Sequence, residues 1–187
     1  MKKITPWKLL KESESLGPAG WMRIITKQYE LPNGNVSNWD LLYGGGRTIA
    51  TLCLTPDNRV LLVRQYRPGP DRVLDEMPGG YIDKGEDPLD AARRELLEES
   101  GWDGDIELVG STWLSSTALT QRFVAVARNC RKVDDQQEDD GEYIEPITKS
   151  LEDFIAQVRK GEMTDTDLAY MALDYAGLLP GQTMKKQ

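Results

Sequence analysis

The sequence predicts a mixed α/β or α+β fold in which a β-sheet lies between helices and an N-terminal antiparallel hairpin or small sheet precedes it. Runs rich in β-branched and aliphatic residues occur in pairs separated by turn signals. One segment, 88–100, carries recognisable signals at both ends of a helix, and two further helix-like segments close the chain. No internal repeat or low-complexity linker interrupts this pattern.

Two β-hairpins are expected in the first third of the chain. The first covers residues 20–43, with Asn33-Gly34 between WMRIITKQYEL and VSNWDLLY, and Asn-Gly is a strong hairpin signal. The second joins TIATLCLTP to RVLLVRQYR through a turn at Asp57-Asn58. Its continuous apolar runs suggest buried strands. The Pro78-Gly79-Gly80 sequence that follows predicts a loop or bulge.

The clearest helix covers residues 88–100. Asp87 suits the N-cap, Pro88 the first helical position and Gly101 the residue that ends the helix. Its expected apolar stripe comprises Leu89, Ala91, Ala92 and Leu96.

The remaining elements follow in order. Strands are expected in DIELVGSTWL and RFVAVARNC, and then an exposed loop at 134–145, which holds seven acids and no base. A helix should begin at Ser150, with Asp153 as its capping-box partner, and end at Gly161. The last helix should cover 165–178, with one face formed by Leu168, Met171, Ala172 and Tyr175.

Composition excludes several function classes. The 187 residues carry 23 Lys+Arg and 31 Asp+Glu, a net charge of −8, which argues against generic nucleic-acid binding. No apolar run approaches the about 20 residues of a membrane span, and no signal-peptide core is visible. The absence of histidine removes Ser-His-Asp, Cys-His and His-ligated metal chemistry. Cys53 lies in an apolar run, so we expect a free core thiol and a cytoplasmic protein.

Three glutamates in the 88–100 helix suggest a metal site. Glu95, Glu98 and Glu99 are spaced i, i+3, i+4, so they share one helix face and repel one another. A hard dication such as Mg²⁺ or Mn²⁺ would make this arrangement favourable, because such ions prefer carboxylate oxygens. The alternative interpretation is a solvated acidic helix face.

The frame around these glutamates resembles the Nudix box: Gly80, five residues, Glu86, seven residues and then RELLEESGW. The resemblance implies a Nudix fold and hydrolysis of a pyrophosphate linking a nucleoside to another group. Glu95, Glu98 and Glu99 would ligate Mg²⁺ or Mn²⁺ with help from the Gly79 carbonyl. Arg94 would orient the glutamates, and we count it with Glu98 as catalytic, while Glu86 would support the box or an outer metal.

The segment VLLVRQYRPGPDRVLDEMPGGYID resembles that of ADP-ribose and ADP-sugar pyrophosphatases. By this resemblance Arg67 and Glu76 would reach the substrate or support its site, although Arg67 could equally be a surface arginine. GEYIEP resembles the segment whose first glutamate approaches the attacking water, which corresponds to Glu142, with Asp140 and Glu138 as alternatives.

The N-terminal region, 1–45, resembles the dimer-forming part of ADP-sugar pyrophosphatases, and 46–187 would be the hydrolase domain. In that group two tryptophans from different subunits, with exchanged N-terminal parts, sandwich the adenine. Trp21 and Trp39 would take this role in a homodimer; the alternative is packing in a core or interface.

The substrate implied by this resemblance is ADP-ribose, which would yield AMP and ribose 5-phosphate. The family's usual proline is replaced by Thr117, which leaves the sugar or nucleoside open. Alternatives are another substrate such as GDP-mannose, broad nucleotide housecleaning, or a non-catalytic sensor of ADP-ribose-like ligands.

Overall fold

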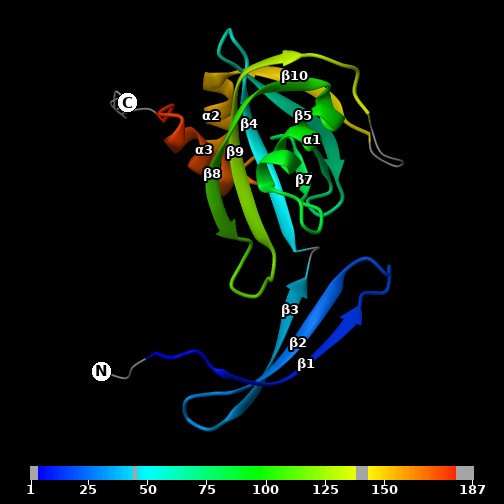
Figure 1. The fold of residues 1–187 in the computed structure, drawn as a ribbon, viewed down its shortest axis with the longest axis vertical. Helices are drawn as coiled ribbons and strands as arrows, with labels where there is room; N and C mark the ends of the chain where they lie inside the picture. Colours follow the sequence, from blue (N-terminus) through cyan, green and yellow to red (C-terminus); the bar gives the residue numbers. More distant parts are fainter. Residues whose placement is uncertain (1–3, 44–45, 138–142, 180–187) are drawn as a thin grey trace. The chain divides into compact units, whose positions relative to one another are not determined.

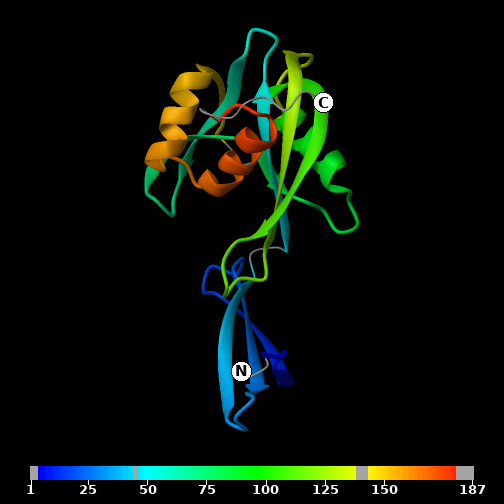
Figure 2. The same ribbon diagram turned by 90° about the vertical axis from the view of Figure 1, so that its left-hand side faces the viewer.

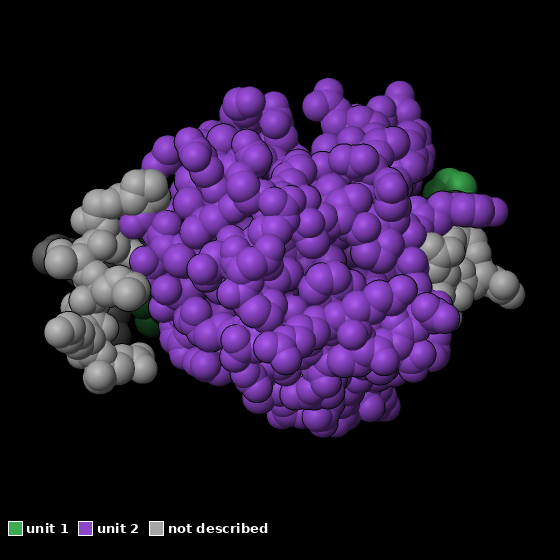
Figure 3. Space-filling model, turned by 90° about the horizontal axis from the view of Figure 1, so that it is seen from above, with its two compact units in different colours: residues 1–46, 113–121 green, residues 47–112, 122–187 purple. Residues whose placement is uncertain are grey.

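The computed structural model describes residues 4–43, 46–137 and 143–179. The chain divides into two compact units, one of residues 1–46 and 113–121 and the other of residues 47–112 and 122–187. Figure 3 colours the first unit green and the second purple. No helix in the described part of the chain combines the length and apolar composition that crossing a bilayer requires.

The first unit is an antiparallel sheet in the order β1 (Lys8–Leu16), β2 (Arg23–Glu30) and β3 (Val36–Tyr43). The predicted hairpin is confirmed, because β2 and β3 pair from Arg23↔Tyr43 to Glu30↔Val36. Strand β1 was not predicted, since its sequence KLLKESESL is largely polar and all of its residues are exposed. The segment after β8 also joins this unit, where the amide of Leu42 donates to the Thr117 carbonyl at 2.9 Å.

The first unit buries little of its own surface. Among its described residues only Ile25, Ala118 and Thr120 are buried. Large apolar side chains of this unit remain exposed, among them Trp7, Leu9, Leu10, Leu16, Trp21, Trp39 and Trp113. A three-stranded sheet with so small a core depends on further packing for its stability.

The second unit is built on a mixed sheet in the order β10-β5-β4-β9-β8, with β6 paired to β5 and β7 to β4. Its strands are β4 (Arg47–Leu54), β5 (Arg59–Arg67), β6 (Arg72–Glu76), β7 (Gly79–Tyr81), β8 (Trp102–Trp113), β9 (Gln121–Lys132) and β10 (Glu145–Ser150). Helix α1 (Pro88–Ser100) covers one face, and α2 (Leu151–Lys160) and α3 (Thr166–Tyr175) cover the other (Figures 1 and 2). The predicted fold class is confirmed.

The larger part of the core lies between the sheet and helices α2 and α3, where Leu52, Leu62, Val124, Phe154 and Leu168 are buried. Two smaller clusters lie under α1 and include Ile49 and Ala92 in one and Cys53, Leu96 and Cys130 in the other. Both cysteines are free and buried, so the core position predicted for Cys53 is confirmed.

Two predictions about helix faces were wrong in part. In α1 the predicted Ala91, Ala92 and Leu96 are buried together with Glu99 and Ser100, but Leu89 is exposed. Helix α3 ends at Tyr175 rather than at 178, and Tyr175 is exposed. The buried face of α3 comprises Leu168, Ala169, Ala172 and Leu173, because the helix is turned by about one residue from the predicted stripe.

The helix ends follow the predicted signals. The Asp87 carboxylate accepts from the Leu89 amide at 2.9 Å, and Gly101 adopts φ +73° at the end of α1. A Cβ at Gly101 would lie 2.2 Å from the carbonyl oxygen of Asp134, so the following chain requires glycine there as well. The Ser150 hydroxyl accepts from the Asp153 amide at 3.1 Å and caps α2.

Candidate active site

The candidate site is formed by the second half of α1 (Pro88–Ser100), strand β7 and the turn that leads into the helix. Strand β7 pairs with β4 so closely that a Cβ at Gly79 would lie 2.1 Å from the Ile49 carbonyl oxygen. A Cβ at Gly80 would lie 2.6 Å from the carboxyl group of Glu95. The sequence predicted a loop or bulge here, but both glycines belong to β7, and they let its backbone lie directly against one of the predicted metal ligands.

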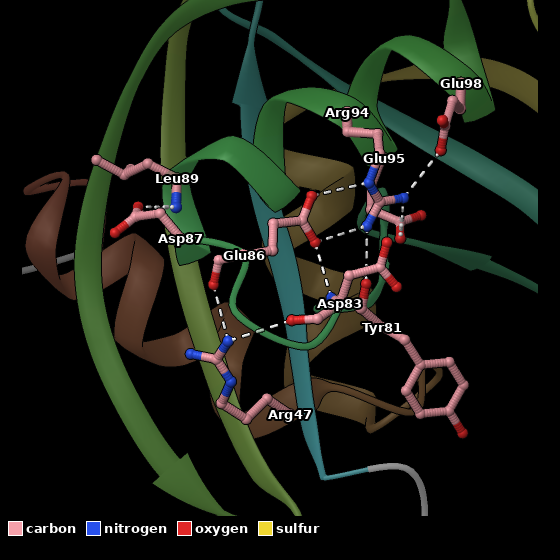
Figure 4. A network of polar contacts seen from close by, with 9 residues as sticks. All are labelled: Arg47, Tyr81, Asp83, Glu86, Asp87, Leu89, Arg94, Glu95 and Glu98. Atoms are coloured by element: carbon pink, nitrogen blue, oxygen red, sulfur yellow. Dashed lines mark hydrogen bonds and ion pairs between the residues drawn. The ribbon is translucent and has the colours of Figure 1, made fainter.

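Arg94 is the centre of a network of carboxylates (Figure 4). Its guanidinium donates to Glu86 at 2.9 Å, to Glu95 at 2.8 Å and to Glu98 at 3.0 Å, and also to the Tyr81 carbonyl at 2.8 Å. The hydrogen bond from Arg94 lowers the pKa of Glu86. The bond to Glu86 in turn raises the pKa of Arg94, so this pair is ionised at neutral pH.

Glu99 contacts the backbone of the first of the two glycines. The Gly79 amide donates to its carboxylate at 2.8 Å, and the residue is buried. The structure therefore brings Glu86, Arg94, Glu95, Glu98, Glu99 and the Gly79-Gly80 backbone to one place.

The donor chemistry of this site suits a hard divalent cation. Among the residues that the structure describes, no three carboxylates or thiols converge closely enough to enclose an ion. Instead Arg94 holds Glu95 and Glu98, while Glu99 accepts from the Gly79 amide. With Glu86, which Arg94 also holds, four carboxylates and one guanidinium give these five side chains a formal net charge of −3. Oxygen donors with this excess of negative charge fit Mg²⁺ or Mn²⁺.

Arg67 and Glu76 form an ion pair between β5 and β6. Glu76 is almost completely buried, and its carboxylate also accepts from the amide, at 3.0 Å, and the hydroxyl of Thr164. Its oxygens are therefore engaged by protein donors, which makes Glu76 a support for Arg67. Arg67 itself remains half exposed at the end of β5.

The other predicted site residues lie either outside the described residues or in the first unit. Glu142 and its alternatives Asp140 and Glu138 lie outside the described residues. Trp21 and Trp39 belong to the first unit. Trp21 is exposed and precedes β2 rather than lying on it, whereas the Trp39 ring lies 5.4 Å from that of Trp7.

An ion cluster near the start of α3, in which a buried arginine meets two more exposed aspartates, was not predicted from the sequence. Arg122 on β9 is almost buried and donates to Asp165 at 3.0 Å and to Asp167. Burial raises the pKa of Asp165, although Arg122 opposes that effect. The arginine that directly precedes the apolar run FVAVA was the signal available in the sequence.

Comparisons with known proteins find similar sequences and a similar fold. The sequence pattern of the NUDIX domain matches residues 45–166. An ADP-ribose pyrophosphatase of Bacillus subtilis is 30% identical over 158 residues, 83% of this chain and 84% of that protein. One of Saccharomyces cerevisiae is 33% identical over 170 residues, 81% of this chain and 72% of that protein. A crystal structure of an ADP compounds hydrolase matches with a TM-score of 0.78 at 18% identity, over 96% of this chain and 100% of that one.

Asp75, beside Glu76 on β6, provides a test of the local electrostatics. Burial alone would raise its pKa, but hydrogen bonds from Arg64 and Lys149 more than offset this and lower it. A carboxyl with a lowered folded-state pKa stabilises the fold above its unfolded pKa of about 3.9, and this contribution is lost as pH falls through the folded value. Asp75→Asn should therefore be less stable than the wild type at pH 7, and the difference should shrink below about pH 4.

Urea denaturation between pH 2.5 and pH 7 measures this difference. Glu152→Gln, at an exposed position on α2, serves as the control and should show a smaller difference at pH 7 than Asp75→Asn. An Asp75→Asn deficit that stays constant across the whole pH range would contradict the assigned ion pairs.

Proposed function

Because the chain belongs to the NUDIX domain family, we propose that it hydrolyses the pyrophosphate bond of a nucleoside diphosphate sugar, with ADP-ribose as the first substrate to test. The products would be AMP and ribose 5-phosphate. The observation that carries this proposal is the Arg94 network, which gathers Glu86, Glu95 and Glu98 beside the two glycines of β7. The names of the relatives reported above favour an ADP-containing substrate over GDP-mannose.

Each residue has a role in this proposal. Glu95, Glu98 and Glu99 would hold Mg²⁺ or Mn²⁺, with the Gly79 carbonyl as a further ligand. Such a cation offsets the charge of the diphosphate and lowers the pKa of the attacking water. Arg94 keeps Glu95 and Glu98 in position, and Glu142 would accept the proton of the water.

Arg67 is proposed to contact the diphosphate, because its half-exposed guanidinium retains donors beyond the one given to Glu76. The buried carboxylate of Glu76 fixes the orientation of that guanidinium, since Thr164 holds its second oxygen. Planar guanidinium groups are well suited to phosphate oxygens.

A homodimer with exchanged N-terminal regions is part of the proposal. Support comes from the exposed apolar side chains of the three-stranded sheet, which buries only Ile25 among its own strand residues. A second copy of the chain would remove this surface from water. Trp21 and Trp39 would then stack on the adenine from the two subunits, at about 1–3 kcal/mol for each stacked ring.

Removing one negative charge from the metal-binding residues tests the site. Glu98→Gln and Glu99→Gln should each lower kcat for ADP-ribose by about 100-fold or more, because a charged ligand is lost. Steady-state assays with Mg²⁺ and with Mn²⁺ measure this, and circular dichroism checks that the variants fold. Glu152→Gln should retain wild-type turnover, and wild-type rates in both site variants would refute the assignment.

Trp39→Ala tests the adenine contact. It should raise KM for ADP-ribose about 10-fold with a smaller change in kcat, as the loss of a stacking ring predicts. Trp113→Ala, at an exposed tryptophan of the same unit, is the matched control and should leave KM unchanged. Equal KM values for Trp39→Ala and Trp113→Ala would contradict the stacking role of Trp39.

Analytical ultracentrifugation of the wild type should show a dimer. A monomer would contradict the proposed exchange of N-terminal regions between two subunits.

A further inference from the structure

Arg47, the first residue of β4, contacts the turn that leads into α1 (Figure 4). Its carbonyl oxygen accepts from the Ile82 amide at 3.0 Å, which extends the β4–β7 ladder by one residue. Its guanidinium Nη2 then donates to the carbonyl oxygens of Glu86, at 2.8 Å, and of Asp83, at 3.4 Å. Both the backbone and the side chain of one residue therefore hold the segment 82–86.

The turn held by Arg47 also carries the carboxylate that holds Arg94. The Glu86 amide donates to the Asp83 carbonyl at 3.1 Å, and the Asp83 amide donates to the Glu86 carboxylate at 2.8 Å. The same carboxylate accepts two hydrogen bonds from Arg94, at 2.9 and 3.2 Å. A shift of this turn would therefore move Arg94, and with it Glu95 and Glu98.

The position of the Arg47 guanidinium is itself restrained. It lies 5.9 Å from the centre of the Phe123 ring, within the range of a cation–π contact. A guanidinium presents two hydrogens on one nitrogen in a fixed plane, which suits two neighbouring carbonyl oxygens, and it stays charged at all physiological pH values.

From these contacts we propose that Arg47 is a positioning residue of the active site. It clamps the turn 83–86 and so fixes the Glu86–Arg94 pair that orients the carboxylates of α1. This inference rests on the proposed function for its consequence, the affinity of the site for a divalent cation, while the clamp is a property of the fold.

The test compares two arginines that make similar bonds at different places. Arg47→Met removes the clamp and keeps an apolar chain of similar length. Arg59→Met is the matched control. Half-buried Arg59, the first residue of β5, donates to the hydroxyl of Thr148 at 3.1 Å and to its carbonyl oxygen at 2.9 Å. These bonds lie beside the last residues of β4, away from the glycines of β7. Mn²⁺ binding to each substrate-free protein is measured by electron paramagnetic resonance, and amide exchange by mass spectrometry.

In Arg47→Met the dissociation constant for Mn²⁺ should rise about 10-fold, as is typical when a group that orients metal ligands is lost. The amides of Asp83 and Glu86 should exchange faster. In Arg59→Met both quantities should stay within twofold of the wild type, even where the melting temperature falls equally. Arg47→Lys should recover part of the Mn²⁺ affinity, because it restores a cationic donor.

Unchanged Mn²⁺ affinity in Arg47→Met, or an equal loss in Arg59→Met, would overturn the positioning role. A wild-type protein that takes up no Mn²⁺ would instead overturn the proposed metal-dependent function. Amide exchange distinguishes the two failures, because it reports the clamp without any metal, and unchanged exchange in Arg47→Met would overturn the clamp itself.

Discussion

The repulsion among the carboxylates of α1 is the constraint around which the site is organised. Glu95, Glu98 and Glu99 lie within two turns of one helix, and Glu86 joins them from the preceding turn. Like charges at this spacing destabilise an isolated helix, so the fold must supply compensating donors. The Arg94 guanidinium donates to Glu95 and Glu98, and the Gly79 amide donates to Glu99, the most buried of these carboxylates.

The remainder of the second unit holds these donors in place. Strand β4 holds Gly79 and Gly80 in place by pairing with β7. Apolar contacts of Ala91, Ala92 and Leu96 fix α1 on the sheet. The caps at Asp87 and Gly101 define where the helix begins and ends. Because β7 and α1 both pack against β4, they keep the charged groups together at a lower cost in conformational entropy than two flexible segments would.

Features that depend on residues close together in the chain could be predicted from the sequence. The caps of α1 and α2, the Asn-Gly hairpin and the spacing of the glutamates all involve neighbours in the chain, and the structure has them where they were predicted. Strand β1 was missed because an exposed strand has no apolar alternation. The roles of Arg47 and Arg122 were missed for a different reason. Arg47 bonds backbone carbonyls, which leave no mark in a sequence, and Arg122 meets acids more than 40 residues away.

In the proposed reaction, the negative charge of the site couples the binding of the divalent cation to the binding of the diphosphate. A net charge of −3 around Arg94 opposes a diphosphate, and the whole chain, at −8, adds no general attraction for one. A divalent cation that binds these carboxylates reduces that opposition, so it must raise the affinity for the diphosphate. Because such coupling is reciprocal, the diphosphate must raise the affinity for the cation by the same factor. Residues that set the spacing of the carboxylates therefore act on both affinities, whether or not they touch either ligand.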